Sequence, residues 1–245
     1  MTQHATLCIL SYNRPQFLPR CIETARDAGV PLEIIVHDDG STDGELLSYL
    51  YQAHADGLIS TLILNAPGFN QGQGVALNRM FSMATGDPIV KIDHDLEFTP
   101  GWLAQANDIL EDPRVGLLGL FKYWLDPVDW RKTIISDVKV RDNEEALRKP
   151  GGGAPIGYAF HTHICGSAMV IPRKVWRQLG PFEEHSEAFA EDAGYQARVR
   201  TSPQWYCALP DEDLVINHGF GVGPSTVVIA PDTVQPIHKE PRIYQ

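Results

Sequence analysis

Apolar and polar positions along the first half of the chain follow two alternating periods. Short apolar runs rich in β-branched residues have the length of buried strands, and each is followed by a segment with apolar residues at helical spacing. The predicted strands cover Thr6–Tyr12, Leu32–Val36, Ile59–Leu64 and the run that starts at Ile89. Strand and helix alternate four times, which predicts an α/β fold with a mostly parallel sheet and helices on both faces.

The predicted helices begin at residues that favour a helix N-terminus. We expect Asn13 to cap the first helix and Thr99 the fourth, each followed by a proline in the first turn. The turn from Gly40 to Asp43 supplies capping side chains for the second helix. These caps define where the polar ends of the strands stop and the helices start.

The second half of the chain has a less regular pattern. Further strands are predicted at Val115–Phe121, Ile164–Ile171, Cys207–Leu209 and Leu214–Asn217, and helices at Arg173–Leu179 and Glu187–Val199. The last helix is acidic at its start and basic at its end, as the helix dipole favours. Lys122 to Tyr158 is too long for an ordinary connection, so we interpret it as a functional insertion.

Composition narrows the possible partners and the compartment. The chain has 245 residues, 43% of them hydrophobic, and a formal net charge of -11, which disfavours a broad nucleic-acid-binding face. The four cysteines are far apart and fit buried, reduced thiols. No signal peptide is visible, and no apolar run approaches the roughly 20 residues of a membrane span. We therefore expect a cytoplasmic protein without a transmembrane anchor.

Three of the predicted strands end in polar residues, namely Ser11-Tyr12-Asn13, Asp38-Asp39 and Asp93-His94-Asp95. Because carboxyl ends of parallel strands share one edge of a sheet, these residues predict a ligand crevice there. Two carboxylates two positions apart suit Mg²⁺ or Mn²⁺ bound to a phosphate. An isolated pair of this kind also occurs as an ordinary polar exit from a strand.

The common dinucleotide and P-loop motifs are absent from the expected place. Gly72-Gln73-Gly74 follows the third strand, whereas a G-x-G-x-x-G fingerprint follows the first, and no Walker A sequence is present. Hydride transfer is therefore disfavoured.

Five segments in order resemble family 2 glycosyltransferases of the GT-A fold. They are Ser11-Tyr12-Asn13-Arg14, Glu33 to Asp43, Ile92 to Asp95, Cys165 to Met169 with Leu179 to Phe182, and Glu191-Asp192 with Arg198. The resemblance covers most of residues 5–200. It implies a single GT-A domain over 1–245, with a Rossmann-like nucleotide-sugar-binding half (1–112), an acceptor and catalytic half (113–218) and a C-terminal tail (219–245).

The resemblance also implies roles at the phosphate end of the donor. Asp95 is expected to ligate a divalent metal ion, Mn²⁺ or Mg²⁺, and Asp93 to contact the ribose or the same metal ion. His218 is expected to complete the metal shell, although a lone histidine is more often structural. Arg79 is an uncertain substitute for a basic residue that family members direct towards the phosphates.

At the nucleoside end, the resemblance implies that Ser11 and Tyr12 line the base pocket and that Asp39 accepts a hydrogen bond from base or ribose. Asp192 is expected to be the general base, with Glu191 second. The alternatives are a capped turn after the second strand and an acid-rich helix N-terminus.

The implied reaction is metal-dependent, inverting transfer of a sugar from a nucleotide-diphosphate sugar, most simply a UDP-sugar, to a hydroxyl acceptor. A glycan, a lipid-linked intermediate, a protein side chain and a modified nucleic-acid base all stay open as acceptors, and the acidic charge disfavours the last. Three alternatives remain: a nucleotidyltransferase, an inactive sugar-nucleotide or glycan-binding module, and a retaining GT-A enzyme.

Overall fold

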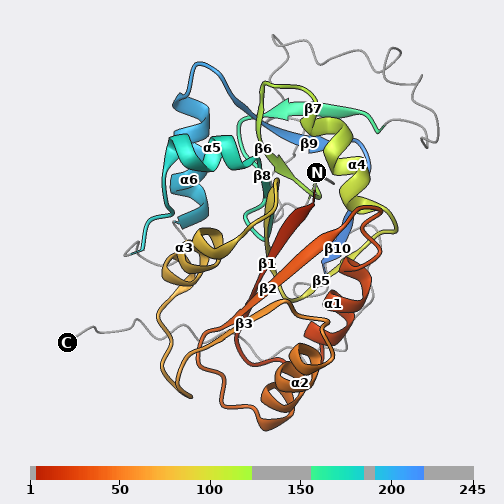
Figure 1. The fold of residues 1–245 in the computed structure, drawn as a ribbon. Helices are drawn as coiled ribbons and strands as arrows, with labels where there is room; N and C mark the ends of the chain where they lie inside the picture. Colours follow the sequence, from red (N-terminus) through yellow and green to blue (C-terminus); the bar gives the residue numbers. More distant parts are fainter. Residues whose placement is uncertain (1–3, 123–155, 185–190, 218–245) are drawn as a thin grey trace, which may run out of the picture.

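A mixed sheet runs through the molecule with helices on both faces (Figure 1). The computed structural model describes residues 4–122, 156–184 and 191–217. In these residues the strand order of the large sheet is β3-β2-β1-β4-β8-β6-β9-β7. The predicted α/β fold is therefore confirmed.

The parallel part of the sheet comes from the first half of the chain. Its strands are β1 (Ala5–Ser11), β2 (Leu32–Asp38), β3 (Thr61–Leu64) and β4 (Ile89–Asp93). β1 lies in the middle and pairs in parallel with both β2 and β4. These are the four strands that the apolar runs predict, so hydrophobic pattern alone identifies this part of the fold.

The second half adds strands of mixed direction. They are β6 (Val115–Gly119), β7 (Tyr158–His161), β8 (Ala168–Ile171) and β9 (Tyr206–Pro210). β8 is antiparallel to both β4 and β6, which inserts the last strands beside the parallel part. The short strands β5 (Leu96–Phe98) and β10 (Val215–Asn217) pair with each other apart from the large sheet.

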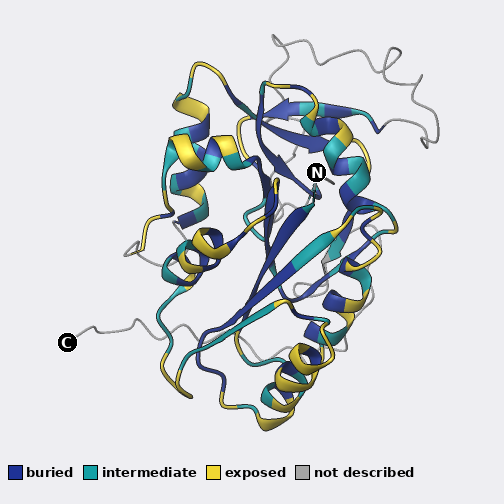
Figure 2. Ribbon diagram, in the orientation of Figure 1, coloured by how far each residue is buried: buried dark blue, intermediate teal, exposed yellow. Residues whose placement is uncertain are grey.

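The helices divide between the two faces of the sheet. α1 (Leu18–Ala25), α2 (Gly44–Ala55) and α4 (Trp102–Leu110) pack into one apolar core. α3 (Gln73–Met83), α5 (Arg173–Leu179) and α6 (Glu191–Thr201) pack into the other. Figure 2 shows buried positions along the sheet and on the inner sides of the helices, with exposed positions facing outwards.

Two predicted helix starts are wrong, and one is confirmed. Asn13 does not cap α1, which begins at Leu18; its side-chain oxygen instead accepts a hydrogen bond from the Thr42 backbone N–H at 3.1 Å. Thr99 does not cap α4, because its hydroxyl lies 3.1 Å from the Leu214 carbonyl oxygen beside β10. Asp43 caps α2 as predicted, accepting from the Leu46 N–H at 2.9 Å.

Other predicted elements differ in length from those of the structure, or they fall on residues that the structure does not describe. β5 and β7 were not predicted, and the strand expected from Ile164 starts only at Ala168. Most of the expected 122–158 insertion, the tail from Gly219 and the first part of the predicted helix from Glu187 lie outside the described residues. None of the described helices is long and apolar enough to cross a membrane.

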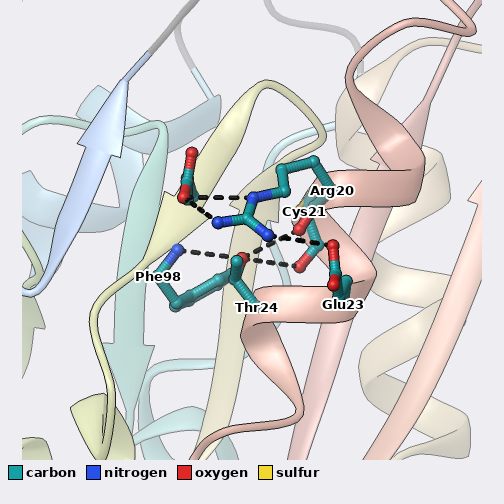
Figure 3. Close-up of polar contacts among 6 residues, drawn as sticks. Arg20, Cys21, Glu23, Thr24 and Phe98 are labelled. Atoms are coloured by element: carbon teal, nitrogen blue, oxygen red, sulfur yellow. Dashed lines mark hydrogen bonds and ion pairs between the residues drawn. The ribbon is translucent and has the colours of Figure 1, made fainter.

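A polar network fixes α1 against β5 (Figure 3). The Arg20 guanidinium donates to Glu97 Oε1 at 2.6 Å and to Glu23 at 3.0 Å. The Thr24 hydroxyl accepts from the Phe98 N–H at 3.1 Å and donates to the Arg20 carbonyl oxygen at 2.9 Å. This contact holds the segment that follows Asp95 against the first helix.

A second polar network joins the turn before β6 to β7. Asp112 is buried and accepts from Arg114 Nη2 at 2.6 Å and from the Tyr158 hydroxyl at 2.7 Å. Burial acts to raise the pKa of Asp112, but the hydrogen bonds from the Arg114 side chain and backbone, and from Tyr158, lower it to about 2. The Asp112 carboxyl group therefore ionises more readily in the folded state than in the unfolded state, and its ionisation stabilises the fold.

The Asp112 network gives stability a defined pH dependence. A lowered carboxyl pKa stabilises the fold above the unfolded pKa, roughly 3.9, and this contribution is lost as pH falls towards 2. We expect Asp112→Asn to lose about 1–2 kcal/mol at neutral pH, discounted because Arg114 is partly exposed. Urea unfolding at several pH values measures the difference, which should shrink in acid. Asp27→Asn, at an exposed position after α1, is the control, and a pH-independent loss for Asp112→Asn would contradict the assignment.

Candidate active site at the carboxyl edge of the sheet

The parallel register brings the polar strand ends to one level. Ser11 of β1 is paired with Asp38 of β2, and Leu10 of β1 is paired with Asp93 of β4. The Asp39 N–H donates to the Ser11 carbonyl oxygen at 2.9 Å. The three polar ends that the sequence indicates therefore lie along the same edge, as expected for parallel strands.

Asp39 organises the loop after β3. Its Oδ1 accepts from Asn65 Nδ2 at 2.7 Å and from the Gln71 N–H at 2.8 Å, and its Oδ2 accepts from the Gly72 N–H at 2.9 Å. A carboxylate oxygen has two lone-pair sites, so Oδ2 has room for one more donor. The described contacts thus give Asp39 a structural role and leave one acceptor site for a ligand.

Asp38 closes the neighbouring turn. Its two oxygens accept from the Ser41 N–H at 2.8 Å and from the Ser41 hydroxyl at 2.6 Å. The Ser41 hydroxyl oxygen in turn accepts from the Asn13 N–H at 2.7 Å, and both Asn13 and Arg14 have positive φ angles. The turn after β2 therefore fixes the unusual backbone after β1.

Ser11 and Tyr12 sit beside this turn. The Ser11 side chain is buried, and its hydroxyl has no hydrogen-bond partner among the described residues. Tyr12 is 43% exposed, a high value for an aromatic side chain next to a buried strand. A buried hydroxyl without a protein partner beside an exposed aromatic ring is compatible with a bound nucleoside.

Asp95 lies in the turn between β4 and β5 and is only 7% exposed. Arg14 Nη1 is 3.4 Å from its Oδ2. Burial and the charge of Asp93 raise the pKa of Asp95, and the charges of His94 and Arg14 oppose the shift. The neighbouring His94 is anchored in the fold, with Nδ1 3.0 Å from the Leu10 carbonyl oxygen.

The two carboxylates fit a divalent cation that also binds phosphate. Burial and mutual repulsion disfavour the ionised form of Asp95, and a cation would relieve both. No group of three or more His, Cys, Asp or Glu suited to a metal ion occurs in the described part of the chain, and His218 lies outside it. Mg²⁺ and Mn²⁺ sites with one or two carboxylates take their remaining ligands from water and substrate phosphates.

Lys91 is a charged residue in the middle of the buried strand β4. It is 2% exposed, and its Nζ donates to Asp93 Oδ1 at 2.9 Å and to the Gly166 carbonyl oxygen at 2.6 Å. Burial alone would lower the pKa of Lys91, but the charge and hydrogen bond of Asp93, with Asp192 and Glu191 behind it, raise it. Lys91 thus links the end of β4 to the segment that precedes β8.

The first turn of α6 supplies two further carboxylates. Glu191 is buried; burial raises its pKa, the charge of Lys91 opposes this shift, and Asp192 adds to it. Asp192 is half-buried and lies so close to Gly166 that a methyl group there would overlap its Oδ2. Lys91, Asp93 and the two carboxylates of α6 are therefore gathered around Gly166.

Arg79 occupies a different position along the edge. It lies on α3 with Nη1 3.5 Å from Nε2 of His37, a buried histidine of β2. Burial lowers the pKa of His37, with the charge of Arg79 acting in the same direction. Arg79 therefore lies over the β2 side of the edge, apart from the group around Gly166, and its predicted role towards the phosphates stays a prediction.

Two contacts around Gly166 escaped the sequence reasoning. Lys91 was read as part of an apolar strand, although a lysine there has a carboxylate two residues later on the same face of the strand. Gly166 falls in the segment Cys165 to Met169 that carries the resemblance, but its contact with Asp192, which is 26 positions away, leaves no pattern in the sequence.

The chain is similar in sequence to known proteins. Residues 6–179 match the model of "Glycosyl transferase family 2". An "Undecaprenyl-phosphate 4-deoxy-4-formamido-L-arabinose transferase" of Pectobacterium carotovorum is 34% identical over 104 residues, which cover 40% of this chain and 31% of that protein. An uncharacterized glycosyltransferase of Nostoc sp. is 30% identical over 109 residues, covering 43% and 32%. These matches span about a third of the relatives' own length.

Solved structures show the same fold at low identity. A mannosyltransferase from Pyrobaculum calidifontis, in complex with GDP-Man and Mn²⁺, has a TM-score of 0.58 at 21% identity, covering 84% of this chain and 56% of that one. S. aureus TarS in complex with UDP has a TM-score of 0.61 at 14% identity, covering 87% and 60%. The fold is that of the GT-A glycosyltransferases.

The contact between Gly166 and Asp192 gives a structural prediction. In Gly166→Ala, the added methyl should displace the Asp192 carboxylate and shift the first turn of α6, because Asp192 Cβ would lie 2.8 Å from the methyl. We expect the free energy of unfolding to fall by about 1–3 kcal/mol. A crystal structure and urea unfolding measure the two effects. Gly44→Ala, in α2 with no atom within 4 Å of the new methyl, is the matched control. An unmoved Asp192 in the variant would show that the contact is not tight.

Proposed function

Because the chain belongs to glycosyl transferase family 2, we propose that it transfers a sugar from a nucleotide-diphosphate sugar to a hydroxyl group of an acceptor. The observation that carries this proposal is the group around Gly166. Lys91 joins Asp93 to the Gly166 carbonyl oxygen, and Asp192 lies against Gly166. This arrangement holds Asp93, proposed to act at the donor phosphates through a metal ion, close to Asp192, proposed to act on the acceptor.

In the proposed reaction Asp192 is the general base. Its carboxylate takes the proton of the acceptor hydroxyl as that oxygen forms a bond to C1 of the sugar and the bond from C1 to the diphosphate breaks. Attack from the face opposite the leaving group inverts the configuration at C1. Asp192 is preferred over Glu191 because it is half-buried and can meet an acceptor, whereas Glu191 is buried. A carboxylate is a modest base, so its position is expected to supply much of the effect.

The phosphate end of the donor is assigned to the turn after β4. Asp95 and the free oxygen of Asp93 would hold Mn²⁺ or Mg²⁺, and Arg14 lies 3.4 Å from Asp95, near enough to add positive charge. When bound, such an ion neutralises charge on the departing diphosphate, which is worth several kcal/mol in related chemistry. His218 remains a proposed further ligand.

The nucleoside end is assigned to the strand ends of β1 and β2. The exposed ring of Tyr12 is available to stack on the base, and the buried Ser11 hydroxyl is available for a hydrogen bond. Oδ2 of Asp39 has one acceptor site left for base or ribose. We propose a UDP-sugar as donor and Arg79 as a secondary contact to the nucleotide.

A phosphate acceptor is the competing possibility, because the name of the Pectobacterium relative includes undecaprenyl phosphate. A phosphate needs no general base, and it would bring negative charge beside Asp93, Glu191 and Asp192, which share one buried lysine. This charge balance favours a neutral hydroxyl acceptor. A panel that pairs the donor with hydroxyl acceptors and with polyprenyl phosphates distinguishes the two.

Substitution of the proposed base tests the mechanism directly. Asp192→Asn should lower the rate of transfer by about 10²- to 10⁴-fold, because the acceptor hydroxyl loses its proton acceptor. The dissociation constant for UDP, measured by calorimetry, should stay close to the wild-type value. The anomeric configuration of the product, measured by NMR, should be inverted relative to the donor.

Two further variants complete this test. Asp27→Asn makes the same change at an exposed position after α1 and should keep the wild-type rate. Glu191→Gln examines the other candidate. Full activity in Asp192→Asn, or equal loss of UDP binding and transfer, would remove Asp192 from the role of base.

Removal of Asp95 tests the metal site. A thermal-shift panel of nucleotide sugars with and without Mn²⁺ should identify a donor whose binding the metal strengthens. Asp95→Asn should lose this Mn²⁺-dependent shift and reduce kcat/KM by about 10²-fold or more, since it removes a carboxylate ligand. EDTA should abolish wild-type transfer, and Mn²⁺ should restore it. Transfer that survives both EDTA and Asp95→Asn would contradict metal dependence.

A further inference from the structure

We propose that Lys91 is a positioning residue for the transfer step, which joins the donor side of the site to the acceptor side and keeps Asp95 as the carboxylate available to the metal ion. The inference rests on the proposed glycosyl transfer. Lys91 would not touch the substrate; it would act through Asp93 and through the Gly166 segment against which Asp192 lies.

Stability does not account for a lysine at this position. Lys91 is 2% exposed, and the four other residues of β4 are three buried apolar side chains and Asp93. Removing a lysine ammonium from water is expensive, and buried ion pairs often contribute no more stability than apolar residues of the same volume. The cost of burying the charge therefore points to a role in the site.

The direction of the side chain follows from the strand. Ile89 packs into the core formed with α3, α5 and α6, whereas Val90 and Ile92 pack into the opposite core. Side chains two positions apart share a face, so Lys91 and Asp93 lie on the α6 side of the sheet. This places the ammonium between the end of β4 and the first turn of α6, where Glu191 and Asp192 begin the helix.

The ammonium group of Lys91 connects two backbone segments. Asp93 belongs to β4, in the half of the chain assigned to the donor. Gly166 precedes β8, and the neighbouring Ser167 carbonyl oxygen accepts from the Asp93 N–H at 2.9 Å. A change in the position of Lys91 would therefore move the Gly166 segment relative to β4, and with it the space that Asp192 occupies.

The charge of Lys91 also gives Asp93 and Asp95 different roles. One oxygen of Asp93 is held by the ammonium, and three carboxylates act on that single buried cation. Among the described residues, Asp95 forms no hydrogen bond with Lys91. It is paired instead with Arg14, at 3.4 Å. Without Lys91, both oxygens of Asp93 would be available to a cation, and Asp95 would no longer be the preferred carboxylate.

Lys91→Met is the decisive variant, because methionine keeps the unbranched shape of the side chain, one atom shorter, and removes the charge. We expect kcat to fall about 10- to 100-fold, the range seen when a residue behind a ligand is removed. KM for the donor should change little, because the nucleotide end of the site is elsewhere. The affinity of the nucleotide-free protein for Mn²⁺, measured by calorimetry, should rise, because a positive charge is lost and Asp93 is released.

A double-mutant cycle separates positioning from a general structural effect. If Lys91 acts through Asp93, the loss of kcat in Lys91→Met/Asp93→Asn should be smaller than the product of the two single losses. Lys174→Met, on the exposed side of α5, is the matched control and should match wild type in kcat and in Mn²⁺ affinity. Urea unfolding verifies that each variant is folded.

Three results would overturn the inference: an unchanged kcat in Lys91→Met, losses of kcat that simply multiply in the cycle, or weaker Mn²⁺ binding by the folded variant. Failure of the proposed function has a different signature. In that case the wild-type chain transfers no sugar, while the Mn²⁺ titrations of wild type and Lys91→Met still report whether Lys91 keeps one oxygen of Asp93 from a cation.

Discussion

Parallel pairing of β1 with β2 and β4 is the constraint on which the site depends. The register sets Ser11 level with Asp38 and Leu10 level with Asp93, so each strand delivers its polar residues to the same edge. Because side chains along this edge come from strand ends, a short turn can place each one without a long loop. Burial of the apolar β-branched residues holds these strands together, and the paired strands in turn determine where the carboxylates lie.

Gathering carboxylates at one edge creates an electrostatic cost, and the described protein groups compensate the four charges to different degrees. Asp38 and Asp39 are satisfied by hydrogen bonds from turns and loops, from the Ser41 N–H in one case and the Gly72 N–H in the other. Asp93 is paired with a buried lysine. Asp95 has a raised pKa although Arg14 lies 3.4 Å away, so among these four it is the carboxylate whose charge the described protein groups compensate least. That difference is a physical reason to assign the cation to Asp95.

The elements that could be predicted from sequence are those whose signal is local. Periodicity identified the parallel strands, and the acidic and basic ends of the helix around Glu191 to Arg198 were readable from its dipole. β5 and β7 are three and four residues long, which is too short for a recognisable pattern. The side chain of Asn13 does accept a backbone N–H, as a helix cap would, but the N–H is that of Thr42. Contacts between distant segments, such as Lys91 with Gly166, leave no such pattern.

Asp39 illustrates how structure adds to a role implied by resemblance. Its carboxylate ties down Asn65, Gln71 and Gly72, so the loop after β3 and the carboxylate cannot move independently. A nucleoside that uses the remaining acceptor site on Oδ2 would bind to a group already held in place, which lowers the entropy cost of binding. Substitution of Asp39 would therefore release the loop as well as remove a ligand contact. Loss of nucleotide binding in such a variant would not by itself separate the two effects, whereas Asn65→Ala, which loosens the loop and keeps the carboxylate, would.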